Sequence, residues 1–294
     1  MKTISFSGQE CAILENDLVQ LLVPRTIGPR ILSLRFCSGA NLFAELPDVT
    51  TDRPDGKPYH FYGGHRLWLS PEDPIRSYAL DDGSVELSPV DGGLLVSKPV
   101  EAESGFAKSI LVRLEANQPR LTLTHRLTNL GPAPVEVAPW AITQFRAGGV
   151  ALLPQAQTGT GLLPNRSLAL WPYTDISTSC LGLGNAFILL RAEMHAPFKL
   201  GFPNPRGWLA YWLDGVLFVK RASFQPQGSY PDFGCSSECY CNPRFLELEM
   251  LGPLSRLEPG AHVDHEETWE LYPGIPSPQN EAVAQALANQ LGLE

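Results

Sequence analysis

The sequence predicts an all-β protein, a large antiparallel sandwich of two packed sheets that ends in one short helix. The 294 residues include 26 glycines and 27 prolines, about 18% of the positions, against a usual combined share of about 12%. Residues of these two types interrupt long helices, so we expect neither a helical bundle nor a doubly wound α/β sheet. Hydrophobic residues make up 44% of the chain, enough to offset the entropy of folding and to exclude disorder.

The N-terminal third is predicted to form β-hairpins. Two apolar runs at 11–14 and 18–23 flank the turn-prone residues 15–17, and a further strand is expected over 30–36. Residues 46–60 are rich in proline and acidic side chains and predict a long loop. A loop of that length in a compact domain is often functional.

The middle of the chain shows the clearest alternation of apolar and polar residues. Strands at 109–115 and 120–129 form a predicted hairpin, in which Leu121, Leu123, His125 and Leu127 share one face. Asp214-Gly215 between two apolar runs is a strong hairpin signal. The further expected strands are 134–145, 186–193, 207–213, 215–221, 244–251 and 262–272.

A single helix is expected near the C-terminus, over about 278–291. Ser277 is suited to cap it, Pro278 to its first position, and Val283, Leu287 and Leu291 recur every four residues. No repeat and no linker divides the sequence. We therefore expect residues 1–294 to form one domain.

Charge and cysteine usage limit the partners and the compartment. The chain carries 22 basic and 31 acidic residues, a net charge of −9, which disfavours nucleic acid and anionic membrane surfaces as partners. A small uncharged or cationic molecule is favoured. The N-terminus has no secretory apolar region, and no apolar run is long enough to span a membrane. The six cysteines are then expected to be free thiols in a reducing cytoplasm.

The densest group of chemically useful residues is YHFYGGHRLWLSPE at 59–72. Tyr62, His65, Arg66 and Trp68 lie around the Gly63-Gly64 pair, where a ligand or another backbone can approach closely. An aromatic platform, a planar guanidinium and an imidazole are what a sugar pocket uses. The alternative is an aromatic-rich core strand beside a tight turn.

A second group lies in RFLELEML at 244–251. On a strand, Glu247 and Glu249 point to one face, about 7 Å apart, in an otherwise apolar segment. Such a pair can hold a base with a perturbed pKa. The alternative is an edge strand whose polar face lies in water.

The third group is Trp140, Thr143 and Gln144, which follow a proline-rich approach. Trp140 could stack on a pyranose ring, or it could be a core tryptophan whose N–H group has one partner.

The sequence predicts neither a metal site nor a cofactor site. Cys235, Cys239 and Cys241 do not have the spacing of paired zinc ligands, although His262 and His265 could complete a site. No phosphate-binding glycine loop and no nucleophile elbow are present.

Several of these stretches together resemble the galactose mutarotase-like (aldose 1-epimerase-like) superfamily, and more narrowly an uncharacterised branch of it. The matching pieces are GPRILSL at 28–34, YGGHRLW at 62–68, LTN at 127–129, PVEV at 134–137, FLELE at 245–249 and LEPG at 257–260. The resemblance covers most of the chain, and it implies a supersandwich with a sugar cleft.

In active mutarotases a glutamate removes the anomeric hydroxyl proton and a histidine protonates the ring oxygen. The resemblance implies Glu249 as the base, with Glu247 as its alternative on the same face. The two histidines of the family pattern are replaced here by Trp140 and Tyr62, so His65 is the expected acid. Further sugar-binding residues are then expected among those of the matching stretches and their neighbours: Arg30, Tyr62, Arg66, Trp68, Trp140 and Gln144.

Three functions follow from these residues. The first is an aldose 1-epimerase-like isomerase that acts on the anomeric centre of a small sugar. The second is a carbohydrate-binding protein without catalysis, which the tryptophan and tyrosine at the histidine positions favour. The third is a glycoside-active enzyme that uses Glu247 or Glu249 with a carboxylate elsewhere. The sequence leaves open which sugar binds, whether it is phosphorylated, and the oligomeric state.

Overall fold

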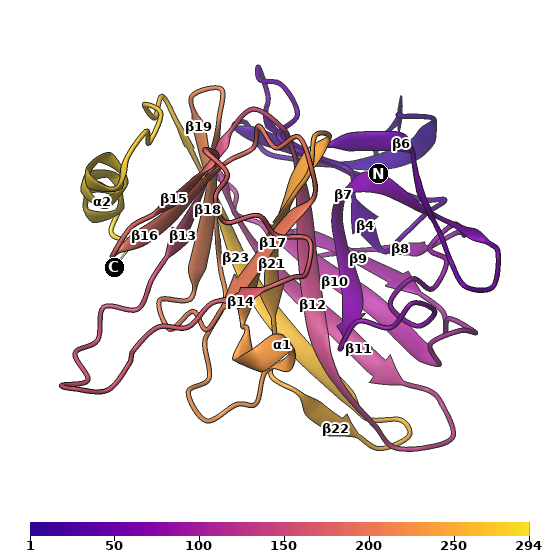
Figure 1. Cartoon of the computed structure of the whole chain (residues 1–294). Helices are drawn as coiled ribbons and strands as arrows, with labels where there is room; N and C mark the ends of the chain where they lie inside the picture. The colour runs from indigo at the N-terminus through magenta and orange to yellow at the C-terminus, as the bar shows by residue number, and fades with distance from the viewer. Residues whose placement is uncertain (294) are drawn as a thin grey trace.

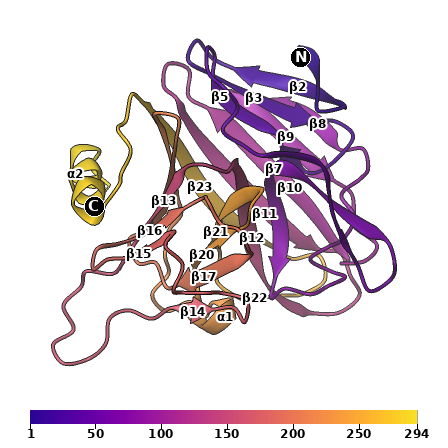
Figure 2. The same cartoon turned by 45° about the horizontal axis from the view of Figure 1, so that its top comes forward.

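Two large antiparallel sheets, of ten and nine strands, pack face to face in the computed structural model, which describes residues 1–293 (Figure 1). A four-stranded sheet lies at one end, as the tilted view in Figure 2 shows. The prediction of an all-β sandwich is confirmed. No helix within residues 1–293 is both long and apolar enough to cross a membrane.

The ten-stranded sheet combines segments from the middle and the end of the chain. From one edge to the other its strands are β15 (Leu181–Leu183), β16 (Phe187–Arg191), β13 (Val150–Pro154), β18 (Trp208–Leu213), β19 (Val216–Arg221), β23 (His262–Pro273), β11 (Arg120–Asn129), β10 (Phe106–Leu114), β9 (Gly93–Lys98) and β8 (Glu86–Val90).

The nine-stranded sheet carries the three predicted site segments side by side. Its strands are β14 (Ala169–Leu170), β17 (Phe198–Phe202), β20 (Ser237–Cys241), β21 (Phe245–Leu251), β12 (Val135–Arg146), β7 (Pro58–Ser70) and β4 (Arg30–Ile31), with β22 (Ser255–Leu257) paired to β12 and β6 (Glu45–Asp52) paired to β7.

The remaining elements are short. The four-stranded sheet contains β1 (Thr3–Phe6), β2 (Gln9–Glu15), β3 (Val19–Pro24) and β5 (Ser33–Phe36), and the helices are α1 (Pro231–Gly234) and α2 (Glu281–Gln290). Helix α2 packs its buried Ala284, Leu287 and Ala288 with apolar residues of the ten-stranded sheet. These sheet residues face away from the inner core, because they alternate along each strand with those that form it.

Local sequence signals placed most of these strands. The hairpin of β10 and β11 forms as predicted, with Leu121, Leu123, His125 and Leu127 buried. The turn at Asp214-Gly215 joins β18 and β19, and both of its residues have positive φ. The inner faces of the two sheets supply the apolar side chains of one continuous core between them.

Two local predictions are wrong. Residues 46–60 do not form a loop, because they belong mostly to β6 and to the start of β7, which pair as a hairpin. Their prolines are tolerated because β6 is hydrogen-bonded to β7 alone. Helix α2 begins later than expected, because the side chain of Asn280, not Ser277, accepts the hydrogen bond from the N–H group of Val283.

A chain of buried polar side chains crosses the core between the two large sheets. The carbonyl oxygen of His265 can only accept, so His125 Nδ1 donates to it (3.0 Å) and His125 Nε2 accepts from His65 Nε2 (2.7 Å). His65 Nδ1 then accepts from the hydroxyl group of Thr143 (2.9 Å), which in turn accepts from Lys220 Nζ (3.2 Å). The chain is closed by the ion pair of Lys220 with Glu267 (3.0 Å).

Both imidazoles in this chain are held neutral. Burial lowers the pKa of His125 to about 4 and lowers that of His65 well below its usual value. As the pH falls below about 6.5, these side chains take up protons in the unfolded chain before they do so in the folded protein. The stability that they contribute is therefore complete above that pH and is lost as the pH falls.

We expect His125 to lower the free energy of unfolding by about 3 kcal/mol between about pH 6.5 and pH 4. The buried carboxyl group of Glu247, whose pKa is raised, acts in the opposite direction over this range, so the contribution of His125 is measured as a difference between two proteins. Urea unfolding at a series of pH values compares the wild type with His125→Gln, which has no titratable group at this position, and the wild type should lose about 3 kcal/mol more than the variant. Parallel curves for the variant and the wild type would contradict the prediction.

Candidate functional site

A cleft of about 580 Å³ lies on the nine-stranded sheet, on the face turned away from the core. Strand pairing places the residues of its floor in two rows across neighbouring strands. In one row Arg66 pairs with Ile142, which pairs in turn with Glu249. In the other row Glu247 pairs with Tyr240, which pairs in turn with Lys199. Residues that directly oppose each other on neighbouring strands share one face of the sheet. The lining residues are Val49, Thr50, Thr51, Phe61, Arg66, Trp68, Glu72, Tyr78, Trp140, Ile142, Trp171, Tyr173, Pro197, Lys199, Tyr240, Asn242, Phe245 and Glu247.

The Gly63-Gly64 pair sets which side chains of β7 face the cleft. A Cβ atom on Gly63 would lie 1.9 Å from the carbonyl oxygen of Ala44, and one on Gly64 would lie 2.1 Å from that of Ile31. Both glycines have positive φ, so only glycine fits here. Beyond the pair, Arg66 and Trp68 line the cleft.

His65 does not lie in the cleft, so its expected position is wrong. Neighbouring residues of a strand point to opposite faces, and His65 is fully buried between the sheets, in contact with His125. No step from this imidazole to a ligand in the cleft follows from the structure.

Arg66 and Glu247 form an ion pair at the floor of the cleft. Arg66 Nη2 donates to Glu247 Oε1 (3.0 Å), and the guanidinium lies 4.4 Å from the ring centroid of Trp68. Burial raises the pKa of Glu247 to about 7, against the opposing effect of Arg66 and with a further increase from Glu249. Nε and Nη1 of Arg66 have no hydrogen-bond partner within the protein.

Lys199 forms a second charged group beside the first. Its ammonium lies 2.7 Å from a carboxylate oxygen of Glu238 and 3.1 Å from one of Glu249, and 4.7 Å and 4.6 Å from the ring centroids of Trp140 and Trp171. Despite burial, the two carboxylates raise the pKa of Lys199 well above its usual value. For Glu238 the main cause is burial itself, which raises the pKa of this carboxyl group far above its usual value, against the opposing effect of Lys199.

The two predicted carboxylates therefore differ in access. Glu249 is fully buried and accepts from the indole N–H of Trp140 (2.7 Å), and it is not among the lining residues. Glu247 lines the cleft. Of the two carboxylates, Glu247 is the one that can contact a ligand.

Trp68 and Trp140 line the cleft but are almost entirely buried, with 5% and 2% exposure. Their rings support Arg66 and Lys199, so they are not open stacking platforms. More open aromatic rings come from Trp171 and from Tyr173, which is 47% exposed. Both follow β14, in the segment that joins β13 to β16.

Three other predicted sugar-binding residues do not line the cleft. Arg30 is fully buried, where it pairs with Asp81 and donates to the carbonyl oxygens of Phe61 and Gly63. Tyr62 lies beside Arg30, with its ring centroid 5.7 Å from the guanidinium carbon. Gln144 lies opposite Glu247 in the strand register but is fully buried, and its amide has no hydrogen-bond partner within the protein.

Sequence reasoning missed several residues that complete the floor and one wall: Tyr78, Trp171, Tyr173, Lys199 and Glu238. A lysine inside the apolar run FKLGF and a glutamate inside SECYC were visible signals, because an isolated charge in a buried strand needs a partner. No local pattern marked Trp171 or Tyr173.

One group of potential metal ligands was found in residues 1–293. It consists of His65, His125 and Glu267, each of which offers one ligand atom, and these three atoms lie within 4.8 Å of one another. The ammonium of Lys220 already lies 3.0 Å from Glu267 and supplies the positive charge there, so the group is suited to a closed hydrogen-bond chain and not to a dication.

Comparisons with solved structures identify the fold. A galactose mutarotase-like protein from Lactobacillus casei matches 89% of this chain and 100% of its own, with a TM-score of 0.57 and 10% identity. A galactose mutarotase-like protein from Clostridium acetobutylicum matches 92% of this chain and 98% of its own, with a TM-score of 0.51 and 10% identity. A TPR-domain containing protein from Parabacteroides distasonis matches 93% of this chain and 49% of its own, with a TM-score of 0.63 and 14% identity.

A scan against protein-family models and a search of the curated proteins found no match. The structural likenesses show that the chain has the galactose mutarotase-like fold, which confirms the resemblance at the level of the fold.

We expect the carboxyl group of Glu247 to titrate with a pKa of about 7, as carbon-13 NMR of labelled glutamate can measure, with Glu247→Gln to assign the signal. Arg66→Met removes the cation that opposes protonation, so it should raise this pKa further. The control Arg256→Met removes an exposed arginine whose partner is Glu258, outside the cleft, and should leave it unchanged. An ordinary glutamate pKa near 4.5 in the wild type would contradict the prediction.

Proposed function

We propose that the cleft binds a neutral saccharide. The observation that carries the proposal is the chemistry of the lining: aromatic rings beside buried polar groups whose hydrogen-bonding capacity the protein does not use. Arg66, which lines the cleft, keeps two nitrogen atoms without hydrogen-bond partners within the protein. Unpaired buried groups cost free energy, and a bound ligand or ordered water can satisfy them.

Both donors and acceptors are present in this cleft, as a sugar hydroxyl requires, because each hydroxyl both donates and accepts. The cations Arg66 and Lys199 are already paired with carboxylates. The floor therefore offers hydrogen bonds without a large uncompensated charge, which favours an uncharged ligand over a phosphorylated one. The rings of Trp171 and Tyr173 supply apolar contact for the faces of a pyranose.

Isothermal titration calorimetry against a panel of neutral mono- and disaccharides should detect binding to the wild type. Replacing both wall residues, Trp171→Ala with Tyr173→Ala, should weaken it about tenfold through lost ring contact. The matched control Phe233→Ala removes an aromatic side chain that is 98% exposed and outside the cleft, and it should not change the affinity. Equal weakening in both proteins, or no saccharide bound by the wild type, would refute the proposal.

A second function, exchange of sugar anomers, is favoured by the pKa of about 7 at Glu247. A group that titrates near the working pH serves best as a general base. In this reaction Glu247 removes the proton of the anomeric hydroxyl, the bond from the ring oxygen to the anomeric carbon breaks, and the ring oxygen takes a proton from water. After rotation about the bond between the anomeric carbon and C2, the ring closes on the other face. In this step the hydroxide ion left by the water takes the proton back from the ring oxygen and Glu247 returns its proton to the carbonyl oxygen, which gives the second anomer. No histidine is among the lining residues, so this route uses water where mutarotases use an imidazole.

NMR exchange spectroscopy on α-glucose and α-galactose tests this second function. The wild type should accelerate anomer exchange, and Glu247→Gln should lose at least about 100-fold of the acceleration, because the base is gone. The exposed Glu266→Gln, which is outside the cleft, is the matched control. Saccharide binding without faster exchange would leave the protein as a binding protein only.

A further inference from the structure

The segment 155–183, which joins β13 to β16 and contains only the short strands β14 and β15, carries an unusual share of the exposed apolar surface. It supplies seven of the 14 large hydrophobic residues that are exposed within residues 1–293: Leu162, Leu163, Leu168, Leu170, Tyr173, Ile176 and Leu183. Leu162 is fully exposed and Leu163 is 72% exposed. Figures 1 and 2 show the part of this segment before β14 extending away from the sandwich.

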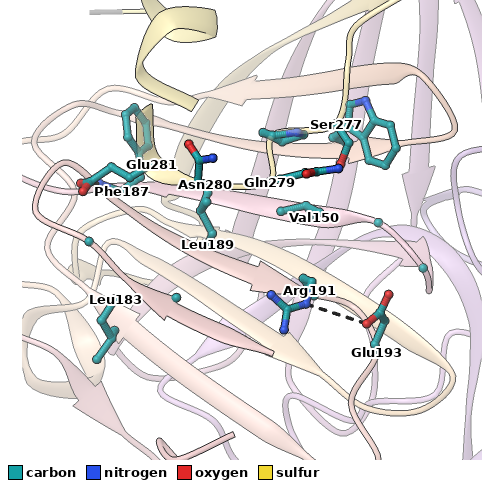
Figure 3. A pocket seen from close by; sticks show the side chains of 16 residues that line it. Val150, Leu183, Phe187, Leu189, Arg191, Glu193, Ser277, Gln279, Asn280 and Glu281 are labelled. Carbon is teal, nitrogen blue, oxygen red and sulfur yellow. Dashed lines mark hydrogen bonds and ion pairs between the residues drawn. The ribbon is translucent and has the colours of Figure 1, made fainter. Parts of the chain in front are cut away.

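A groove of about 650 Å³ lies at the edge of the ten-stranded sheet, beside the start of helix α2 (Figure 3). Its apolar wall comes from β13, β15, β16 and β18: Val150, Leu183, Phe187, Leu189 and Trp212. The carboxylate of Glu281 accepts from the backbone N–H groups of Ala186 and Phe187, which fixes the start of the helix beside β16. Because α2 has ten residues, it leaves this part of the outer sheet face open.

We propose that a second copy of this chain places Leu162 and Leu163 in this groove. The part of the segment before β14 and the elements that line the groove, β15, β16 and the start of α2, lie on one side of the same molecule, as both views of the whole chain show. A two-fold arrangement of two copies would then fill both grooves at once, since each copy offers one projection and one hollow. Exposed apolar patches of this kind mark interaction surfaces.

Charge favours this contact over others between two copies. The whole chain has a net charge of −9, so two copies repel each other at most orientations. The segment 155–183 contains one arginine, Arg166, and one aspartate, Asp175, and is therefore neutral. The contact is expected to strengthen with added salt, because salt screens the repulsion between the rest of the two surfaces.

Sedimentation velocity over a range of protein concentrations tests the proposal. We expect a monomer–dimer equilibrium that shifts toward the dimer at higher salt. Leu162→Asp and Leu183→Asp, which alter the projection and the groove, should each weaken the dimer at least about tenfold. The matched controls Val100→Asp and Leu130→Asp add the same charge at apolar residues that are 50% and 52% exposed elsewhere, and they should have no effect. A wild type that stays monomeric at every concentration would overturn the proposal.

Cross-linking distinguishes two arrangements: the segment of one copy lying in the groove of another copy, and the segment lying in the groove of its own chain. The exposed Cys37 is first replaced by serine, and then Leu163→Cys and Leu183→Cys proteins are mixed and oxidised. The proposal predicts a disulfide-linked pair in the mixture, in excess of that formed by either protein alone. A disulfide that forms only within a single chain carrying both substitutions would overturn it. These readouts involve no sugar, so they are independent of the proposed function.

Discussion

The ammonium group of Lys199 holds the floor of the cleft together. Glu238 and Glu249 lie directly opposite each other on β20 and β21, and without a shared cation two buried carboxylates so close would repel each other strongly. The same cation lies against the rings of Trp140 and Trp171. One interaction therefore joins the three neighbouring strands β17, β20 and β21, a fourth strand, β12, through Trp140, and the segment between β13 and β16 that forms a wall.

The reverse face of the same sheet is braced in a similar way. Lys220 donates to the carbonyl oxygens of Ala141 and Leu248, on β12 and β21, the two strands that carry Trp140 and Glu247 into the cleft. Lys220 and its partner Glu267 both come from neighbouring strands of the ten-stranded sheet, so the lysine reaches across the core. A paired lysine thus lies against each face of the nine-stranded sheet, and the position of the cleft floor depends on the packing of the core behind it.

The two-residue period of a strand explains both the success and the error of sequence reasoning. It correctly places Glu247 and Glu249 on one face, because the run FLELE alternates without interruption. The same period puts His65 on the face opposite Arg66, although the composition of the motif at 62–68 suggests one cluster. Lys199 and Glu238 reach the site through strand register between segments far apart in the chain. No local pattern encodes that register.

One segment, 155–183, carries both the wall residues Trp171 and Tyr173 and the projecting leucines. A ligand in the cleft and a partner at the groove would therefore act on the same stretch of backbone. Binding equilibria that share a conformational element are linked, and the linkage is reciprocal: the factor by which one changes the other is the same in both directions. Within this segment only β14 and β15 are held by sheet pairing, so the cleft wall and the projection share a stretch of backbone in which a shift at one end can reach the other.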